Sequence, residues 1–510
     1  MRDRAAHRNH PDPIVPGMIL PDNPDDQRLK AHTAPADWVA PAGTGTYNLV
    51  VIGGGPAGLV AAFGAAGLGG RVALVERGML GGDCLISGCV PSKALLRSAH
   101  AAQAARDAAE LGVQTTVEVD FPAVMARMRR LRADIGPHDS AERLRAAGID
   151  VFFGSARFAG PDTVQVGDRT LHFARCLIAT GARAAMPPIP GLVEAGALTN
   201  EELFNLTERP ARLVVLGAGV IGCEMAQAFA RLGSTVTVVD RVDRVLPREE
   251  PEASALVAAR LARDGITLVL SAAVARIERA DAARVVVLSD GRTLVGDALL
   301  VATGRTPNVD LDLDRAGVAV GKAGITVDDH LRTANPRIYA AGDVIGQAQF
   351  THAADHMARI VLRNALFPSP PARVSALVIP RVTYTHPEVA AVGLSAQDAA
   401  ADPTLTVYTV GIGDTDRGRT DGETEGYARV VVDGKGRIRG ATVVGEAAGE
   451  LLAPLTLAVT HRVTMGQLAS TIHPYPTRSE LVFKLASLWN KERLTPMAAK
   501  LLGGWLRFTR

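Results

Sequence analysis

The chain of 510 residues has little excess charge, few cysteines and no long apolar run. Its 55 basic and 53 acidic side chains leave a formal net charge of +2, which gives no reason to expect nucleic acid as a partner. The first residues carry charges but no apolar core of signal-peptide length, and the later Ala, Gly and Leu runs are interrupted. We therefore expect a cytoplasmic protein. Its length and its hydrophobic content of 47% suffice for about three packed domains.

Two of the four cysteines, Cys84 and Cys89, stand five residues apart in the run GGDCLISGCVPSK. This spacing predicts a redox-active dithiol, because two close thiols can close a small ring. A helix expected to start near Pro91 would place its positive end beside Cys89 and favour its thiolate. A zinc site would need a second cysteine pair or His-x-x-x-His, and a structural disulfide would be unusual without an export signal. We expect Cys176 and Cys223, in apolar contexts, to be core residues.

A dinucleotide-binding motif precedes the dithiol. The buried strand predicted at 48–52 leads into three glycines that open a helix: Gly53, Gly55 and Gly58. The first glycine makes the tight turn, the second lets a pyrophosphate approach the backbone, and the third permits close helix packing. Glu76 ends the next predicted strand, 71–76, where an acid binds a ribose hydroxyl.

The same pattern recurs later in the chain. The predicted strand 212–216 leads into a second set of glycines: Gly217, Gly219 and Gly222. Asp240 ends the predicted strand 235–240. It follows Gly217 by the same number of residues by which Glu76 follows Gly53, so both sites suit an adenosine ribose without a 2′-phosphate. Arg241 and Arg244 can partly neutralise this preference. We expect NADH at the second site, with NADPH as the alternative.

Together, these motifs resemble those of the flavoprotein disulfide reductases, the family that includes dihydrolipoyl dehydrogenase, glutathione reductase and mercuric reductase. The resemblance covers residues 47–485 and also rests on three further runs: 179–181 (ATG), 302–308 (ATGRTPN) and 333–343, which ends in IYAAGD. It implies an α/β fold with two Rossmann-like dinucleotide-binding domains, the NAD domain being inserted in the FAD domain. A C-terminal α+β interface domain would make a homodimer.

The resemblance also sets the expected domain boundaries. The FAD-binding domain would comprise 46–195 and 326–373, the NAD(P)-binding domain 196–325, and the interface or dimerisation domain 374–486. The N-terminal extension 1–45 is rich in Pro, Asp and Ala without periodicity, and we expect an extended or partly ordered arm. The tail 487–510 is basic and amphipathic, and we expect it to pack on its own protein or the dimer partner. Peripheral contact with an anionic membrane is the alternative.

Residue roles carry over from the same resemblance. Cys84 would be the interchange thiol that meets the substrate, and Cys89 the thiol that forms a charge-transfer contact with the flavin. Lys93 would lie near flavin N5, paired with Glu224, and Asp343 would hold the flavin ribityl chain. The full FAD set is Gly53, Gly55, Gly58, Glu76, Lys93, Thr180, Gly181, Gly342 and Asp343. The NAD(P) set is Gly217, Gly219, Gly222, Asp240 and Gly304. No resident metal site is predicted.

The sequence departs from the disulfide-reducing members near its C-terminus. There the family usually has His-Pro-Thr-x-Ser-Glu, whose histidine serves the interchange thiol of the other subunit and is oriented by the glutamate. Alignment on Pro476, Thr477 and Glu480 places Tyr475 at the histidine position. A phenol titrating near pH ~10 cannot shuttle protons at neutral pH as imidazole does. His473 is the alternative shuttle, although two flanking prolines stiffen its segment.

Tyrosine at this position is what mercuric reductases carry, so the resemblance tilts toward them. A soft metal held between two thiolates needs no histidine shuttle. Mercuric reductases also carry a cysteine pair near the C-terminus, yet no cysteine follows Cys223 here. We therefore predict that electrons pass from NAD(P)H through FAD and the Cys84–Cys89 dithiol to a disulfide or thiol-bound metal. The alternatives are dihydrolipoyl dehydrogenase, against which Tyr475 argues, and a flavin-dithiol redox sensor.

Overall fold

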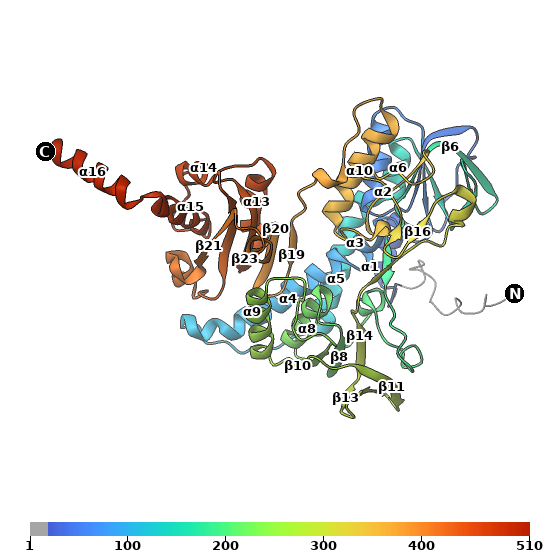
Figure 1. Cartoon of the computed structure of the whole chain (residues 1–510). Helices are drawn as coiled ribbons and strands as arrows, with labels where there is room; N and C mark the ends of the chain where they lie inside the picture. The colour runs from blue at the N-terminus through green and yellow to red at the C-terminus, as the bar shows by residue number, and fades with distance from the viewer. Residues whose placement is uncertain (1–18) are drawn as a thin grey trace. The chain divides into compact units, whose positions relative to one another are not determined.

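The computed structural model describes residues 19–510, and the chain folds as two compact units. The first contains residues 19–217, 228–239 and 272–377, and the second contains 218–227, 240–271 and 378–510 (Figure 1). The predicted α/β fold class is confirmed. The residues of the predicted NAD(P)-binding domain, 196–325, are divided between the two units, and the predicted domain boundaries stay predictions.

A seven-stranded sheet forms the centre of the first unit. Five of its strands run parallel, and two at one side form an antiparallel extension. The path of the sheet is β3 (Ile149–Phe153), β2 (Val72–Glu76), β1 (Thr46–Ile52), β6 (Arg169–Ile178), β5 (Thr163–Val166) and β4 (Ala156–Gly160), with β18 (Ile338–Ala340) also paired to β6.

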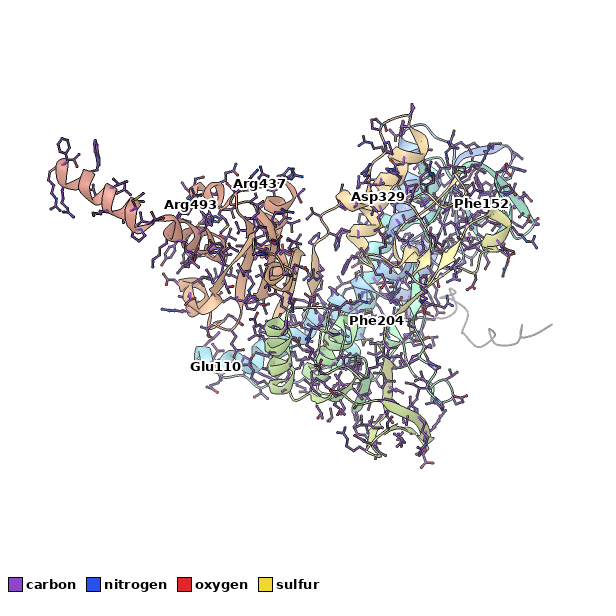
Figure 2. The ribbon with its side chains drawn as sticks, viewed as in Figure 1. Glu110, Phe152, Phe204, Asp329, Arg437 and Arg493 are labelled. Atoms are coloured by element: carbon purple, nitrogen blue, oxygen red, sulfur yellow. The ribbon has the colours of Figure 1, made fainter. Side chains whose placement is uncertain are left out.

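The sequence of β1 explains its central place. Leu49, Val50, Val51 and Ile52 are all buried, as expected for a parallel strand that is covered on both faces. Helices α2 (Pro56–Gly67) and α10 (Thr351–Leu366) pack against the sheet and against each other. Large side chains of the sheet are also buried in the core, among them Phe152 on β3, which is labelled in Figure 2.

The first unit also holds the strands of the second dinucleotide fold. These are three parallel neighbours in the order β9 (Thr235–Val239), β8 (Arg212–Leu216) and β14 (Ala298–Val301). The remaining strands form small antiparallel sheets: β11 (Val274–Ala280), β12 (Ala283–Leu288) and β13 (Thr293–Gly296); β7 (Ala182–Ala184) and β15 (Arg305–Pro307); β16 (Val320–Gly321) and β17 (Gly324–Ile325). Helix α8 (Val220–Arg231) follows β8, as the second glycine motif predicted.

The other helices of the first unit lie before residue 204. They are α1 (Pro24–Thr33), α3 (Gly82–Ile86), α4 (Cys89–Asp107), α5 (Phe121–Ile135), α6 (Ala141–Ala146) and α7 (Asn200–Leu203). Helix α1 lies in the N-terminal extension, where we expected an extended or partly ordered arm; residues 1–18 of that extension lie outside the described part. The face that α1 buries consists of Asp26, Leu29 and Thr33. Only one of these three residues is strongly apolar, so the sequence has no apolar stripe that would predict this helix.

The second unit contains a five-stranded antiparallel sheet. Its order is β19 (Arg381–Thr383), β20 (Glu388–Gly393), β23 (Ile438–Gly445), β22 (Tyr427–Asp433) and β21 (Leu405–Gly411). Helix α13 (Ala448–Thr460) packs on β20 and β23, and α15 (Glu480–Arg493) packs on β21 and β22. The unit also contains α9 (Pro251–Arg263), β10 (Thr267–Val269), α11 (Ala396–Ala400), α12 (Asp416–Asp421), α14 (Met465–Ser470) and α16 (Pro496–Phe508).

The tail helix α16 buries none of its residues in the single chain. Its large apolar side chains are all exposed: Met497, Leu501, Leu502, Trp505, Leu506 and Phe508. No residue of α16 is therefore buried against its own chain, whereas Trp489, near the start of the predicted tail, packs against the core of the second unit. Packing of α16 on the dimer partner or on a membrane surface stays a prediction. Among residues 19–510, no helix has both the length and the apolarity to cross a bilayer.

Candidate functional site

The first glycine motif forms a turn that has no room for side chains. Gly53 has φ +109°, and a Cβ there would lie 2.3 Å from the carbonyl oxygen of Ala179. A Cβ on Gly58 would lie 1.8 Å from the Gly53 carbonyl oxygen. By contrast, a Cβ on Gly55 would meet nothing closer than the Cα of Gly82 at 3.9 Å. The turn therefore packs tightly beneath Gly53 and leaves space at Gly55, as close approach of a pyrophosphate requires.

Glu76 is held by the backbone of this turn. Its Oε2 accepts from the N–H of Gly54 at 2.6 Å, and its Oε1 accepts from the N–H of Gly78 at 2.7 Å. Burial raises the pKa of Glu76, and these backbone donors oppose that shift. The bonds fix the carboxylate at the end of β2, the position where an acid accepts a ribose hydroxyl in this fold.

The second glycine motif repeats these contacts. Gly217 has φ +111°, and a Cβ there would lie 2.4 Å from the Ala302 carbonyl oxygen. Asp240 Oδ2 accepts from the N–H of Ala218 at 2.6 Å, the counterpart of the bond between Glu76 and Gly54. A Cβ on Gly219 would meet no atom within 4 Å. Both turns therefore fit a dinucleotide, and an unphosphorylated ribose suits the acid in each.

The other residues predicted for the cofactors lie on loops after strands, apart from Lys93 and Gly222, which lie in helices. Thr180 Oγ1 donates to the Asn308 carbonyl at 2.7 Å, and Asn308 Nδ2 donates to the Thr180 carbonyl at 2.9 Å. Four predicted glycines complete the sets: Gly181 and Gly342, with φ of +65° and +79°, Gly304, with φ of +146°, and Gly222, which lies in α8. Asp343 follows Gly342, and burial raises the pKa of its carboxyl.

The dithiol spans two consecutive helices. Cys84 lies in α3, and Cys89 is the first residue of α4, two residues before the predicted start at Pro91. Cys89 thus lies in the first helical turn, where unpaired N–H groups and the helix dipole favour a thiolate. The N–H of Gly81 donates to the carbonyl of Gly54 at 2.8 Å, so the first glycine turn also holds the beginning of α3.

The two cysteines differ in acidity. A hydrogen bond from the Cys84 thiol lowers the pKa of Cys89 to about 6 against the opposing effect of burial, and Thr351 and Lys93 add to the lowering. Thr351 Oγ1 lies 3.4 Å from Cys89 Sγ. The same bond to Cys89, together with burial, raises the pKa of Cys84. In the reduced pair, Cys89 therefore carries the thiolate and Cys84 retains its proton.

An acid beside Cys84 connects the dithiol segment to Arg305 and, through it, to Asp343. Asp83 Oδ1 accepts from Ser87 Oγ at 2.7 Å and from Asn200 Nδ2 at 2.9 Å. Its Oδ2 lies 2.9 Å from Arg305 Nη2, and Arg305 Nε lies 3.6 Å from Asp343 Oδ2. Sequence reasoning missed this network. Arg305 directly follows the predicted Gly304 and could have been found there, whereas Asn200, like Thr351, stands far from the dithiol in sequence without a local signal.

Lys93 and Glu224 lie in different units. Lys93 lies one helical turn after Cys89 on α4, and its charge contributes to the low pKa of Cys89. Glu224 is buried, and its Oε1 accepts from the N–H of Tyr384 at 2.9 Å. The pairing of Lys93 with Glu224 stays a prediction.

The C-terminal motif gives Tyr475 a carboxylate partner. Its hydroxyl donates to Asp416 Oδ2 at 2.9 Å, which raises the pKa of Tyr475. Tyr475 is 71% exposed in the single chain. Glu480 forms an ion pair with Lys484 at 3.1 Å, and its Oε2 is buried without a hydrogen bond. His473 packs its ring near Phe483, and its Nε2 is likewise buried without a hydrogen bond; its role as a shuttle stays untested.

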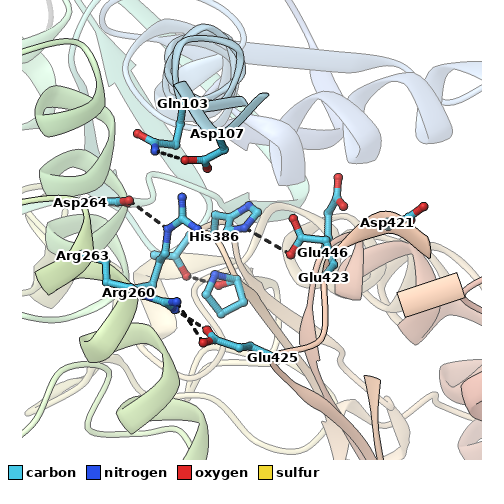
Figure 3. Close-up of polar contacts among 12 residues, drawn as sticks. Gln103, Asp107, Arg260, Arg263, Asp264, His386, Asp421, Glu423, Glu425 and Glu446 are labelled. Atoms are coloured by element: carbon cyan, nitrogen blue, oxygen red, sulfur yellow. Dashed lines mark hydrogen bonds and ion pairs between the residues drawn. The ribbon is translucent and has the colours of Figure 1, made fainter. Parts of the chain in front are cut away.

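A polar cluster in the second unit surrounds His386, which follows β19 (Figure 3). Its Nε2 lies 3.7 Å from Glu423 Oε2, its backbone N–H donates to Gln227 Oε1, and its carbonyl accepts from Gln227 Nε2. Arg263 and Glu425 form a further ion pair in this view. These contacts agree with a structural role for His386. Within residues 19–510, no group of three or more His, Cys, Asp or Glu side chains could hold a metal ion.

The acidity of Cys89 can be measured directly. Because its pKa is lowered to about 6, the thiolate forms above this pH, whereas an ordinary thiol stays protonated until pH ~8.5. We expect the ultraviolet thiolate absorbance of the reduced protein, relative to Cys89→Ser, to titrate near pH 6. Thr351→Val removes one donor and should move the titration to higher pH. Titration at the ordinary thiol pKa would contradict the assignment.

Comparisons with known proteins agree with this geometry. Residues 47–358 match the pyridine nucleotide-disulphide oxidoreductase family, and residues 379–486 match the dimerisation domain of that family, which supports a homodimer. Over 442 residues, the chain is 37% identical to a mercuric reductase from Bacillus cereus, covering 85% of this chain and 70% of that protein. It is 34% identical over 462 residues to a dihydrolipoyl dehydrogenase from Haloferax volcanii, covering 87% and 96% respectively.

A solved structure shares the fold. The HOCl-induced flavoprotein disulfide reductase RclA from Escherichia coli matches with a TM-score of 0.79 and 30% identity, covering 87% of this chain and all of that one. The predicted family resemblance is confirmed. The chain therefore belongs to the pyridine nucleotide-disulphide oxidoreductases, enzymes that bind FAD and use NAD(P)H.

Proposed function

We propose that the enzyme is an NAD(P)H-dependent reductase, with NADH preferred, that passes electrons through the Cys84–Cys89 dithiol to a disulfide or a thiol-bound metal ion. The carrying observation is the unequal acidity of the two thiols, with a thiolate at Cys89 and a protonated Cys84. Bound FAD would supply two-electron transfer between the nicotinamide and the dithiol.

The dithiol can supply both electrons for the reduction of a disulfide. The proton of Cys84 passes along its hydrogen bond to the Cys89 thiolate, and the Cys84 thiolate attacks one sulfur of the acceptor. The acceptor S–S bond breaks, and the leaving thiolate takes this proton from Cys89. The Cys89 thiolate then attacks Cys84 Sγ and releases the second acceptor thiolate. The acceptor gains two electrons, and the cysteines end as a disulfide.

Tyr475 is the reason for including a metal acceptor. A soft metal bound by two thiolates needs no proton shuttle, and relatives of this chain include mercuric reductases. A phenol hydrogen-bonded to Asp416 is a poor proton shuttle at neutral pH because its pKa is raised further. These observations favour a thiol-bound metal or a small disulfide over lipoamide.

The acceptor can be identified by NADH oxidation with the FAD-loaded enzyme. The panel contains mercuric and cupric thiol complexes, glutathione disulfide and lipoamide. We expect a metal–thiol complex or a small disulfide to be turned over faster than lipoamide. Lipoamide as the best acceptor would instead make the enzyme a dihydrolipoyl dehydrogenase. If no acceptor raises the rate above the background with oxygen, a redox sensor becomes the better description.

The order of the two sulfurs predicts a spectroscopic difference. After reduction with one equivalent of NADH, the wild-type enzyme should show a long-wavelength charge-transfer band from the Cys89 thiolate. Cys89→Ser should lose this band while FAD stays bound. The matched variant Cys84→Ser has no disulfide to reduce, so its Cys89 thiolate should give the band with oxidised flavin before any NADH is added. A band that survives in Cys89→Ser would mean that the two roles are reversed.

The cofactor preference depends on Asp240. Its carboxylate repels a 2′-phosphate, so kcat/KM should be higher with NADH than with NADPH. Asp240→Ala should narrow this difference, because Arg241 and Arg244 remain. Asp240→Asn is the matched control, since an amide oxygen can still accept from the Ala218 N–H without the charge. A wild-type preference for NADPH above about tenfold would show that the arginines dominate.

The C-terminal motif predicts a role for Tyr475 at the interchange sulfur of the other subunit. Tyr475→Phe removes the hydroxyl and should lower turnover with the true acceptor by roughly ten- to a thousandfold, while reduction of FAD by NADH stays intact. Tyr475→His should raise activity on a small disulfide near neutral pH, because imidazole can shuttle the proton.

Two further variants serve as controls for this prediction. Asp416→Asn leaves the phenol in place but weakens its hydrogen bond, so it should change turnover less than Tyr475→Phe. His473→Ala should be nearly silent. If His473→Ala is the damaging change and Tyr475→Phe is silent, the proton chemistry belongs to His473.

A further inference from the structure

Residues 19–33 of the N-terminal extension pack against the elements that carry the dithiol, all within the first unit. Helix α5 contacts both α1 and α3 (Figure 1). The N–H of Leu80, just before α3, donates to the carbonyl of Thr33 at the end of α1, at 3.0 Å. One apolar cluster includes residues from both parts: Ile19, Leu29, Met79, Leu85 and Ile86. The extension is therefore part of the support of the redox turn.

A buried ion pair lies at the centre of this contact. Asp26 is fully buried in the first turn of α1, and its Oδ1 lies 2.8 Å from Nη2 of Arg132 on α5, which is 1% exposed. Arg129 Nε lies 3.8 Å from the other carboxylate oxygen, and Arg129 also donates to the Leu206 carbonyl at 2.8 Å. Burying a guanidinium without a counter-charge carries a large desolvation penalty. The Asp26 carboxylate offsets this penalty for Arg132.

The second terminal nitrogen of the Arg132 guanidinium contacts the dithiol segment. Its Nη1 donates to the carbonyl of Ile86 at 2.8 Å. Ile86 is the last residue of α3 and stands between Cys84 and Cys89. Carbonyls at a helix end lack partners within the helix, so this bond supplies one. The planar guanidinium thereby connects a carboxylate of the extension to the backbone between the two thiols.

We propose that Asp26 and Arg132 are positioning residues that hold the Ile86 carbonyl and thereby the spacing of Cys84 and Cys89. This inference rests on the proposed redox role of the dithiol and extends it to the N-terminal extension. Without the Asp26 charge, the buried Arg132 is unpaired and its hold on Ile86 weakens. The turn then loosens, and closure of the disulfide ring becomes less favourable.

Two variants of the full-length, FAD-loaded enzyme test this coupling. Asp26→Asn keeps the side-chain size and removes the charge. Arg132→Lys keeps an ion pair with Asp26, but a single ammonium group does not reproduce the two-pronged contact with Asp26 and Ile86. The readout is the Cys84–Cys89 disulfide in mixtures of oxidised and reduced dithiothreitol, which exchange two electrons and two protons with the pair, quantified by mass-tagging of free thiols.

We expect each variant to weaken disulfide formation about tenfold, equivalent to about 30 mV for a two-electron couple. The Cys89 thiolate titration should also move to higher pH, because its hydrogen bond from Cys84 depends on the same spacing. The matched control is Lys30→Gln, on the same helix as Asp26, which removes an ion pair with Asp22 before the helix without touching Arg132. This control should leave both thiol readouts unchanged, even if it lowers Tm.

The outcomes separate this inference from the proposed function. If both test variants lower Tm but keep wild-type thiol readouts, Asp26 only anchors the extension and the inference is overturned. If Asp26→Asn does not fold, the thiol readouts of Arg132→Lys alone test the inference, because this variant retains the ion pair with Asp26. Failure of the wild-type enzyme to form the Cys84–Cys89 disulfide would overturn the proposed function and this inference with it.

Discussion

The absence of space for a side chain at Gly53 is the constraint on which the redox centre depends. The carbonyl of Ala179 lies so close that any Cβ would collide with it, and this contact fixes the path of the chain from β1 into α2. The neighbouring Gly54 uses both of its backbone groups: its N–H binds Glu76, and its carbonyl accepts from Gly81 at the start of the dithiol segment. One tight turn therefore positions the Glu76 carboxylate and the start of the dithiol segment together.

The chemistry of the dithiol depends on groups gathered from distant parts of the first unit. Thr351 comes from the start of α10, Lys93 from the next turn of α4, and Arg132 from α5. Each acts on a different part of the segment: two stabilise the Cys89 thiolate, and the third binds the backbone between the cysteines. An ordinary pair of cysteines thus becomes one thiolate and one thiol, the asymmetry that dithiol exchange requires.

The sequence predicted correctly those elements whose conformation depends on neighbouring residues in the chain. The strands before both glycine motifs, the acids Glu76 and Asp240 at the ends of the following strands, and the helix after Cys89 all follow from short-range rules. It gave no sign of α1, because a helix that buries a carboxylate has no apolar stripe. It also missed Asp416 as the partner of Tyr475, since 59 residues separate them and neither stands in a pairing motif.

The sequence by itself determined the family, the two dinucleotide folds and the dithiol, because each is encoded in contiguous residues whose backbone conformation and chemistry are local. Only the tertiary structure decided which groups stabilise the Cys89 thiolate and what supports the redox turn. The pKa of Cys89 depends on Cys84, Thr351 and Lys93 together, and the support of Ile86 depends on an ion pair between α1 and α5. Such effects fall off steeply with distance, and distances between remote segments exist only in the folded chain.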